Sequence, residues 1–294
     1  MQFLDNQPNA LILSMERGVP GDIYRAGDGV HLVWQKHKYS RVFKRILNPM
    51  NYILPKLEKT SLGKSKYIVA NSKLIKKHLH DHYTNLLESR TFVIYNGYDE
   101  KVFKRLSNEE KIKIRQNWNF SVNNFNLLFS GSGWERKGLD WSLELTKKLL
   151  QANVPIKFWV AGKGDKNKYQ KVAKRLGIIE AVEFIGPVKN IQELYQIADY
   201  MILPTKYDAF SNSCLEALSC GCPVMTTTQN GAAELIDKAN GLVVDIGNPN
   251  ALENAVAHLS DYRSNKATIS FRFNINNLGN CREIQEYHRL LNLA

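Results

Sequence analysis

The sequence has few cysteines and no long apolar run, and its first residues are not expected to form a secretory signal. Its 294 residues include four cysteines. These form no CxxC pair and have no histidine at zinc-ligand spacing, so neither a disulfide framework nor a structural zinc site is expected. The longest apolar runs fall far short of the ~20 residues that cross a bilayer. The first residues carry an acid and a proline and no basic stretch, unlike a secretory signal. A reducing cytosol is the expected compartment.

Acidic residues are scarce in the first part of the chain. The net charge is +12, and residues 1–120 hold 21 Lys and Arg against 11 Asp and Glu, which leaves an excess of only +2 for the rest. This asymmetry indicates that the N-terminal part faces an anionic partner, such as nucleic acid, an acidic membrane surface or a phosphorylated substrate. With 44% hydrophobic and 23% charged residues the composition is that of a folded protein. It excludes disorder, collagen and coiled coil, and the length predicts two domains.

The beginning of the chain predicts a loop and then a basic helix. Residues 21–34 are polar and glycine-rich at irregular spacing, which is typical of a loop. Residues 36–62 are basic and helical in pattern. The apolar residues expected to share one face of this helix are Val42, Phe43, Ile46 and Leu47.

The next segments predict a strand, a helix and a second strand. Residues 66–72 form a short buried strand that enters a helix capped by Ser72, and residues 91–97 form a strand that ends in an Asn-Gly turn. This is a βαβ pattern. Residues 99–124 are charged and helical without an apolar face, which predicts a connector between domains.

From residue 125 onward, short β-rich runs alternate regularly with helices. The six runs are residues 126–132, 157–164, 181–188, 200–205, 223–228 and 241–244. Helices are expected after Gly138 and over residues 166–176, 190–198 and 212–220. Strands spaced in this way are parallel and buried on both faces, so the fold class is α/β with a doubly wound sheet. Ligands of such sheets bind at the carboxyl ends of the strands.

The loop after the first of these runs predicts a phosphate-binding turn. Residues 131–138, GSGWERKG, follow a strand and open a helix, where backbone amides and glycines such as Gly131 and Gly133 can surround a phosphate. The loop matches neither the dinucleotide GxGxxG pattern nor a P-loop. Arg136 and Lys137 are adjacent cations that suit a diphosphate. The alternative is a solvated charged pair at a loop tip.

A second constellation lies in residues 207–224, YDAFSNSCLEALSCGCPV. Asp208 follows a strand and Glu216 stands eight positions later in a helix, so the two carboxylates can bind sugar hydroxyls or stabilise positive charge at a glycosyl centre. The amides at the start of this helix, which favour an anion, are those of Phe210, Ser211 and Asn212. Alternatively, Ser213 and Glu216 form a capping box and only stabilise the helix end.

Together these segments resemble a known family. ERKG after a strand, the glycine loop after WVAG, FIGPV, and YDAFSNSCLEALSCGCPV with the later NGAAELI are similar to the C-terminal domain of retaining nucleotide-sugar glycosyltransferases of family four. Residues 22–34, DIYRAGDGVHLVW, also resemble the lipopolysaccharide core glucosyltransferases of that family. The resemblance covers residues 125–260 and, in patches, 21–105. It implies the GT-B fold, with two Rossmann-like doubly wound domains.

The resemblance implies a role for each matching position. Arg136 and Lys137 would hold the donor diphosphate, and Ser211 and Asn212 would face its phosphates. Glu216 would bind the nucleotide ribose. The residue beside the base would be Val188, and the residue touching the transferred sugar would be Asp208. Asp208 stands where the family has a glutamate, which is one methylene longer.

The N-terminal part departs from the family pattern. The strand and glycine-rich loop that open a GT-B N-domain do not precede Gly21, so we expect an incomplete first domain. The expected organisation is a partial acceptor-side domain (1–105), a connector (106–124), a donor-binding domain (125–270) and a helix (271–294) that packs toward the first domain. The acceptor-side residues are Arg25, which would meet an acceptor phosphate, and Asp28 and His31, which would face the cleft or cap a turn.

The resulting hypothesis is a transferase that moves a hexose, with glucose as first candidate, from a UDP-sugar to a lipid-linked core oligosaccharide with retention. Asp208 and Asp28 are the catalytic candidates. No cofactor and no metal are expected, and His78, His80 and His82 are interpreted as part of a solvated basic helix rather than a metal site. The protein is expected in the cytoplasm, held peripherally by charge on the inner face of the inner membrane. The alternatives are a non-catalytic polyanion binder and an inactive truncated transferase; a nicotinamide oxidoreductase is disfavoured because the dinucleotide pattern fails.

Overall fold

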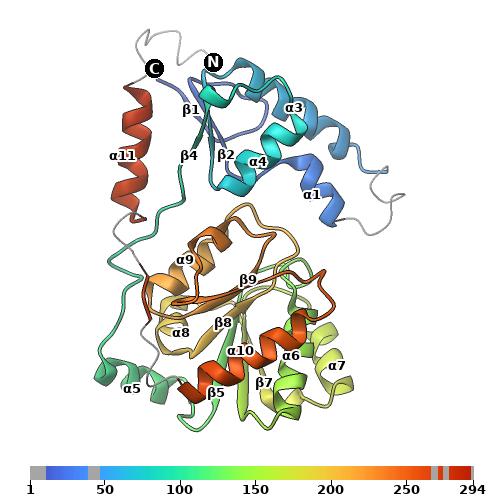
Figure 1. Ribbon diagram of the computed structural model, residues 1–294, viewed down its shortest axis with the longest axis vertical. Helices are drawn as coiled ribbons and strands as arrows, with labels where there is room; N and C mark the ends of the chain where they lie inside the picture. The colour runs from blue at the N-terminus through green and yellow to red at the C-terminus, as the bar shows by residue number, and fades with distance from the viewer. Residues whose placement is uncertain (1–10, 39–46, 266–270, 274–277, 293–294) are drawn as a thin grey trace. The chain divides into compact units, whose positions relative to one another are not determined.

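The computed structural model describes residues 11–38, 47–265, 271–273 and 278–292. The chain divides into two compact units. The first consists of Met1–Gly97 together with Asn280–Ala294, and the second is Tyr98–Gly279. Each unit contains one parallel β-sheet with helices packed on it (Figure 1).

The first unit has a four-stranded sheet in the order β1-β2-β3-β4, with every pairing parallel. The strands are β1 (Leu13–Ser14), β2 (Ile23–Ala26), β3 (Tyr67–Ala70) and β4 (Thr91–Val93). The helices are α1 (His31–Lys38), α3 (Met50–Lys64), α4 (Lys73–His82) and α11 (Asn280–Leu291), with a 3-10 turn at Glu88–Arg90. The predicted strand, helix, strand pattern is confirmed, but the second strand ends at Val93 rather than at an Asn-Gly turn at residue 97. Ser72 caps α4 by accepting the amide of Ile75 at 3.1 Å.

The prediction of a loop over residues 21–34 is wrong. Strand β2 occupies four of these positions, and α1 begins at His31. Ile23 and Tyr24 are both buried, because a strand inside a parallel sheet is covered on both faces. A strand of only four residues between glycines lacks the periodicity that would distinguish it from a loop.

The basic helix predicted over residues 36–62 is two helices in the described chain. Helix α1 ends at Lys38, and α3 begins at Met50 after Pro49. Of the four residues expected on one apolar face, Val42, Phe43 and Ile46 lie outside the described residues, and Leu47 is 65% exposed.

The last helix of the chain completes the core of the first unit. In α11, Tyr287 and Leu290 are buried against Ile23, Val69 and Ile94 of the sheet region. Burying these side chains stabilises the unit by roughly 1.5–3 kcal/mol for each large apolar residue. The first unit is therefore built from both ends of the sequence.

The second unit is a doubly wound domain, as the alternation of strands and helices predicted. Its six-stranded parallel sheet has the order β10-β9-β8-β5-β6-β7. The strands are β5 (Phe125–Ser130), β6 (Ile156–Ala161), β7 (Val182–Gly186), β8 (Tyr200–Leu203), β9 (Val224–Thr227) and β10 (Gly241–Val244). The helices are α5 (Asn108–Asn117), α6 (Leu139–Gln151), α7 (Lys166–Arg175), α8 (Ile191–Ile197), α9 (Asn212–Ser219) and α10 (Ala251–Asn265), with 3-10 turns at Ile179–Ala181 and Gly231–Leu235.

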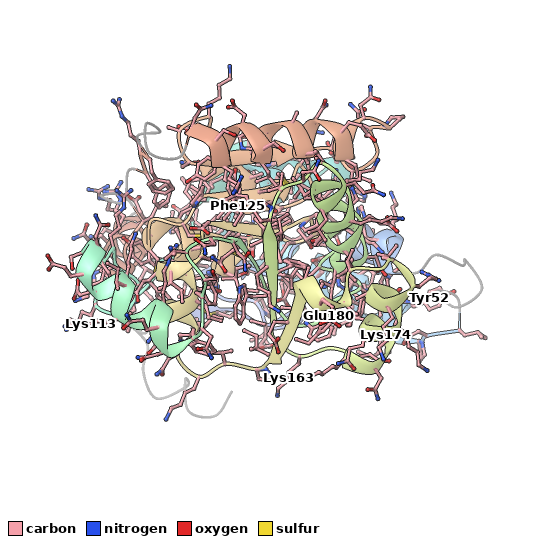
Figure 2. All side chains as sticks on the ribbon, turned by 90° about the horizontal axis from the view of Figure 1, so that it is seen from below. Tyr52, Lys113, Phe125, Lys163, Lys174 and Glu180 are labelled. Atoms are coloured by element: carbon pink, nitrogen blue, oxygen red, sulfur yellow. The ribbon has the colours of Figure 1, made fainter. Side chains whose placement is uncertain are left out.

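The helices of this unit form two groups, one on each face of the sheet. Helix α6 contacts α7 and α10, whereas α8 contacts α5 and α9 (Figure 1). All six residues of β5 are buried between them. In Figure 2, Phe125 at the start of β5 lies in the interior, while Lys113 on α5 and Lys174 on α7 lie at the periphery.

The segment predicted as a connector contributes a helix to the second unit. Helix α5 starts with a complete capping box formed by Ser107 and Glu110. Its Arg115 forms an ion pair of 2.6 Å with the buried carboxylate of Asp199 and donates to the carbonyl of Ile197. Within the part of the chain that the structure describes, no helix has the length and hydrophobicity to cross a bilayer.

Candidate functional site

The loops at the carboxyl ends of four neighbouring strands are hydrogen-bonded to one another in the second unit. The amide of Gly133, after β5, donates to the carbonyl of Lys163, after β6, at 3.0 Å. The amide of Lys206, after β8, donates to the carbonyl of Arg136 at 2.9 Å. The amide of Asp208 donates to the carbonyl of Gln229, after β9, at 3.0 Å. The edge at which a doubly wound sheet binds ligands is thus one connected surface.

Two glycines allow these loops to approach so closely. Gly138 has φ +82°, and a Cβ added there would lie 2.1 Å from the carbonyl oxygen of Pro204. Gly162 has φ +104°, and its Cβ would lie 2.2 Å from the carbonyl oxygen of Gly131. Any other residue would push the loops after β5, β6 and β8 apart. Gly133 also has a positive φ, of +75°, but the space around it is open.

The two predicted donor cations lie beside the predicted sugar-side acid. The ammonium of Lys137 donates to Oδ2 of Asp208, and Nη1 of Arg136 lies 3.9 Å from the same oxygen. Nη1 of Arg136 also donates to the carbonyl of Tyr207 at 2.9 Å. The side chain of Lys137 is 11% exposed and that of Asp208 is 15% exposed. The interpretation as a solvated pair at a loop tip is therefore wrong for Lys137.

The loop that carries Asp208 leads directly into helix α9. Phe210 and Ser211 are buried, and the exposed Asn212 is the first helical residue. The Ser211 amide donates to Oδ1 of Asn230 at 3.1 Å, and the Ser211 hydroxyl lies 2.9 Å from that of Ser213. The amino end of α9 and the carboxylate of Asp208 are held on the same loop.

Glu216 does not form the capping box that was the alternative interpretation. The N-cap residue of α9 is Ser211, and it makes no side-chain capping bond. Burial raises the pKa of the Glu216 carboxyl, and a hydrogen bond with the Tyr195 hydroxyl opposes this shift. The Tyr195 hydroxyl also lies 2.8 Å from Oγ of Ser130, at the end of β5. Glu216 is thus a half-buried acid beneath the carboxyl edge of the sheet.

Val188 lies in the loop after β7 and is half-buried. Its predicted place beside a nucleotide base stays a prediction. Gly131 follows β5, and its Cβ would make only ordinary contacts with Lys137 and Leu203. The space at Gly131 therefore does not by itself require glycine.

The three acceptor-side residues belong to the first unit. Arg25 lies on β2, where it donates to Oδ1 of Asn96 at 2.7 Å and forms an ion pair of 3.2 Å with Glu283 of α11. An acceptor phosphate would therefore compete with Glu283 for this guanidinium. The predicted role of Arg25 stays a prediction.

Asp28 and His31 differ in their exposure. The Asp28 side chain is 82% exposed and lies 3.3 Å from Nη1 of Arg17. His31 is buried and stacks on Trp34, with ring centroids 5.1 Å apart. Burial and the nearby Arg17 lower the pKa of His31, which favours a neutral imidazole. Asp28 is thus available to a ligand, whereas His31 has little surface to offer.

Two residues of the candidate site in the second unit were not predicted from the sequence. Asn230 bonds the start of α9, and Tyr195 bonds Glu216, yet each comes from a different element from its partner. The sequence signal for Asn230 was its place at the start of NGAAELI, one of the segments that carry the family resemblance. The structure brings these residues together through strand order, which a single sequence does not display.

The described residues contain no group of three or more His, Cys, Asp or Glu side chains placed to hold a metal ion. The three histidines of α4 are engaged locally. Nε2 of His80 lies 2.9 Å from Glu88, and Nδ1 of His82 lies 3.0 Å from the carbonyl of His78.

Residues 124–261 match the family model described as glycosyl transferases group 1. An uncharacterized glycosyltransferase of Methanocaldococcus jannaschii is 31% identical over 201 residues, which is 67% of this chain and 51% of that protein. The lipopolysaccharide glucosyltransferase WaaG of Escherichia coli is 32% identical over 145 residues, which is 48% of this chain and 38% of that protein. The chain thus spans about half or less of the length of these curated relatives.

Solved structures share the fold. The crystal structure of WaaG, a glycosyltransferase involved in lipopolysaccharide biosynthesis, has a TM-score of 0.76 at 22% identity, covering 98% of this chain and 80% of that one. Anabaena HepE, solved in complex with UDP, has a TM-score of 0.71 at 20% identity, covering 92% of this chain and 72% of that one. The predicted α/β class and GT-B fold are confirmed.

Proposed function

We propose that this protein transfers a hexose from a UDP-sugar, because residues 124–261 match the glycosyl transferases group 1 family and the chain has the GT-B fold. Glucose is the proposed sugar, and a lipid-linked core oligosaccharide is the proposed acceptor. Both follow the resemblance to WaaG, whose name states lipopolysaccharide and glucose. Transfer with retention of configuration is proposed from the same resemblance.

The observation that carries the proposal is the cluster of Lys137, Arg136 and Asp208 next to the amino end of α9. Two cations and a helix terminus provide positive charge for a diphosphate without a metal ion. A carboxylate on the same loop can accept sugar hydroxyls. Glu216 lies about one helical turn after Asn212 on α9, and its carboxylate can accept hydrogen bonds from the ribose hydroxyls of the nucleotide.

The chemistry follows from this placement of charge. An oxygen of the acceptor hydroxyl bonds to the anomeric carbon while the bond from that carbon to the diphosphate oxygen breaks. The proton of the acceptor hydroxyl passes to a phosphate oxygen of the departing UDP, on which negative charge grows as the bond breaks. Lys137, Arg136 and the amino end of α9 stabilise that charge, and an oriented set of donors in a partly dry site does so more strongly than water. Asp208 stabilises positive charge at the sugar.

The association with the membrane is part of the proposal. The excess of +10 on residues 1–120 would draw the protein to an anionic surface. On α3, Tyr52 is 54% exposed and Ile53 is 45% exposed, and Lys56 and Lys59 on the same helix are exposed as well. Apolar and basic side chains together suit a lipid interface. The proposed location is the cytoplasm, at the inner face of the inner membrane.

Isothermal titration of the full chain with UDP, UDP-glucose and a single-stranded oligonucleotide tests the proposal. The expected result is saturable binding of UDP and tighter binding of UDP-glucose. Binding of the oligonucleotide without either nucleotide would favour the polyanion-binding alternative and overturn the proposed function. A chain that binds UDP-glucose but never transfers glucose would be an inactive relative of the family.

A further inference from the structure

A buried chain of side-chain hydrogen bonds connects the ends of β8 and β9 to the start of α9. Oγ1 of Thr226, on β9, donates to the carbonyl of Leu203, the last residue of β8, at 2.7 Å. Nδ2 of Asn230 donates to the same Thr226 oxygen at 2.9 Å. Oδ1 of Asn230 accepts the amide of Ser211, the N-cap residue of α9, at 3.1 Å.

The three residues whose side chains or amides form this series of hydrogen bonds are buried. Thr226 is 0% exposed, Asn230 1% and Ser211 2%. The side-chain amide of Asn230 makes two further hydrogen bonds. Its Oδ1 also accepts the amide of Ala232 at 3.1 Å, and its Nδ2 lies 3.5 Å from Sγ of Cys214. A buried network in which the polar atoms are paired rigidifies its surroundings, and removing one partner leaves the others unsatisfied.

Capping of the following 3-10 turn does not account for Asn230. Its bond to the amide of Ala232 is that cap. The same oxygen also holds the Ser211 amide, 19 residues earlier in the sequence, and the amide nitrogen reaches back to β9. A residue that served only the 3-10 turn would need neither of these bonds.

The backbone next to Asn230 is paired with Asp208. The amide of Asp208 donates to the carbonyl of Gln229, and the amide of Gly231 donates to the carbonyl of Asp208, each at 3.0 Å. Asp208 and Asn230 thus form an isolated parallel bridge. Any shift of Asn230 is transmitted to the residue that carries the carboxylate.

We propose that Asn230 is a positioning residue that sets the reach of Asp208 toward the transferred sugar and holds the amino end of α9 at the diphosphate. The inference rests on the proposed function. An aspartate has one methylene less than a glutamate, so its carboxylate depends more on where the backbone places it. Asn230, braced by Thr226, determines that place, and it touches no reacting atom itself.

The test uses three variants of the full chain: Asn230→Ala, Thr226→Val and, as the matched control that keeps the hydroxyl, Thr226→Ser. Hydrogen exchange of the peptides that contain Ser211 and Ala232 reports on the hydrogen-bond chain without any ligand. Exchange should be faster at both sites in Asn230→Ala and at Ser211 in Thr226→Val. It should be restored nearly to wild type in Thr226→Ser.

The second measurement is the ratio of the dissociation constants for UDP and UDP-glucose, which isolates the sugar contacts. Asn230→Ala should lower the preference for UDP-glucose by about tenfold. This is the effect expected when a buried polar group loses its hydrogen-bond partner. In the background of Asp208→Asn, the same substitution should leave the ratio unchanged, because residues acting through one another are not additive.

Several outcomes would overturn the inference. Faster exchange with an unchanged ratio would make the chain of bonds merely structural. An equal loss in the Asp208→Asn background would show that Asn230 acts without Asp208. If Asn230→Ala does not fold, the pair Thr226→Val and Thr226→Ser decides by the same readouts. A wild-type chain that binds neither nucleotide overturns the proposed function and the positioning role together, whereas slow Ser211 exchange in Asn230→Ala refutes the hydrogen-bond chain alone.

Discussion

The ammonium of Lys137 donates a hydrogen bond to the carboxylate of Asp208. The resemblance assigns the first residue to the diphosphate and the second to the sugar, so the two ends of the donor would be joined by this ion pair. Both side chains are largely buried. Without ligand each neutralises the other, and a bound diphosphate would compete with Asp208 for the ammonium. In the proposed function, diphosphate binding and sugar recognition would therefore be coupled through this ion pair.

Replacing Lys137 with alanine should weaken UDP binding about tenfold or more, because a charged hydrogen bond in a partly dry site contributes ~1.5–3 kcal/mol. It also leaves the Asp208 carboxylate, among the described residues, with the more distant Arg136 as its ion-pair partner, 3.9 Å away. Calorimetric titration measures the change. Lys174→Ala, at an exposed position of α7, is the control and should bind like the wild type. Unchanged affinity in the double variant Arg136→Ala and Lys137→Ala would contradict the assignment of the diphosphate site.

Asp208→Asn should separate binding from transfer. The substitution frees the Lys137 ammonium, so the affinity for bare UDP should stay the same or rise. Transfer should fall far more, because the lost charge acts on the sugar in the transition state. Titration with UDP measures the affinity, and kcat with UDP-glucose measures the transfer. A parallel loss of UDP affinity and kcat would show that Asp208 serves the nucleotide instead.

Glu216→Gln should lower UDP affinity without lowering the melting temperature. Burial raises the pKa of this carboxyl in the folded state. The folded chain then holds the proton more tightly than the unfolded one, so the free energy of unfolding falls as pH rises from the unfolded pKa through the folded pKa. Glutamine removes this loss, and the variant should melt at or above the wild-type temperature at pH 7.

The same carboxyl predicts the pH dependence of binding. A carboxylate accepts ribose hydroxyls better than a protonated acid does, so wild-type affinity for UDP-glucose, whose phosphates do not titrate in this range, should decline with acidification at a pH above the ordinary glutamate range. Titrations at several pH values should show this decline in the wild type and not in Glu216→Gln. A marked drop in melting temperature with intact affinity would instead assign Glu216 a structural role.

Sedimentation with vesicles tests the proposed membrane association. Vesicles with anionic lipid should bind the protein at low ionic strength and release it at high salt, since each basic residue near the surface contributes about 1 kcal/mol. Tyr52→Ser on α3 should weaken the binding to anionic vesicles and leave UDP affinity intact. Equal binding to neutral and anionic vesicles would count against an electrostatic association.

If the proposed function holds, addition of EDTA should leave transfer activity intact, because Arg136, Lys137 and the α9 terminus would provide the charge that a divalent ion supplies in other transferases. Assays with EDTA, and with added magnesium or manganese, measure this. Strict dependence on either ion would contradict the mechanism.

The second unit was predictable from sequence because its signals are local. Each strand is a short apolar run bounded by glycine, proline or polar residues, and regular alternation with helices specifies a parallel sheet. The positions of Arg136, Asp208 and Glu216 at loops and helix starts followed from the same pattern. Strand β2 was misread, because four residues between glycines give no measurable period.

Contacts between distant segments were not predictable. Lys137 and Asp208 are separated by 71 positions. Nothing in either local sequence indicates that one neutralises the other. Asn230 lies in a polar stretch that reads as an ordinary turn, and its role depends on the adjacency of β8 and β9. Such pairs are set by strand order, which arises only when the whole sheet has formed.

The contribution of α11 to the first unit has a consequence for synthesis. Residues 98–279 form the second unit without interruption, so it can be finished as it leaves the ribosome. The first unit emerges earlier but waits for Tyr287 and Leu290 before Ile23, Val69 and Ile94 are covered. Until α11 is synthesised, the nascent sheet of the first unit exposes this apolar surface. We expect chaperones to bind the sheet during that interval.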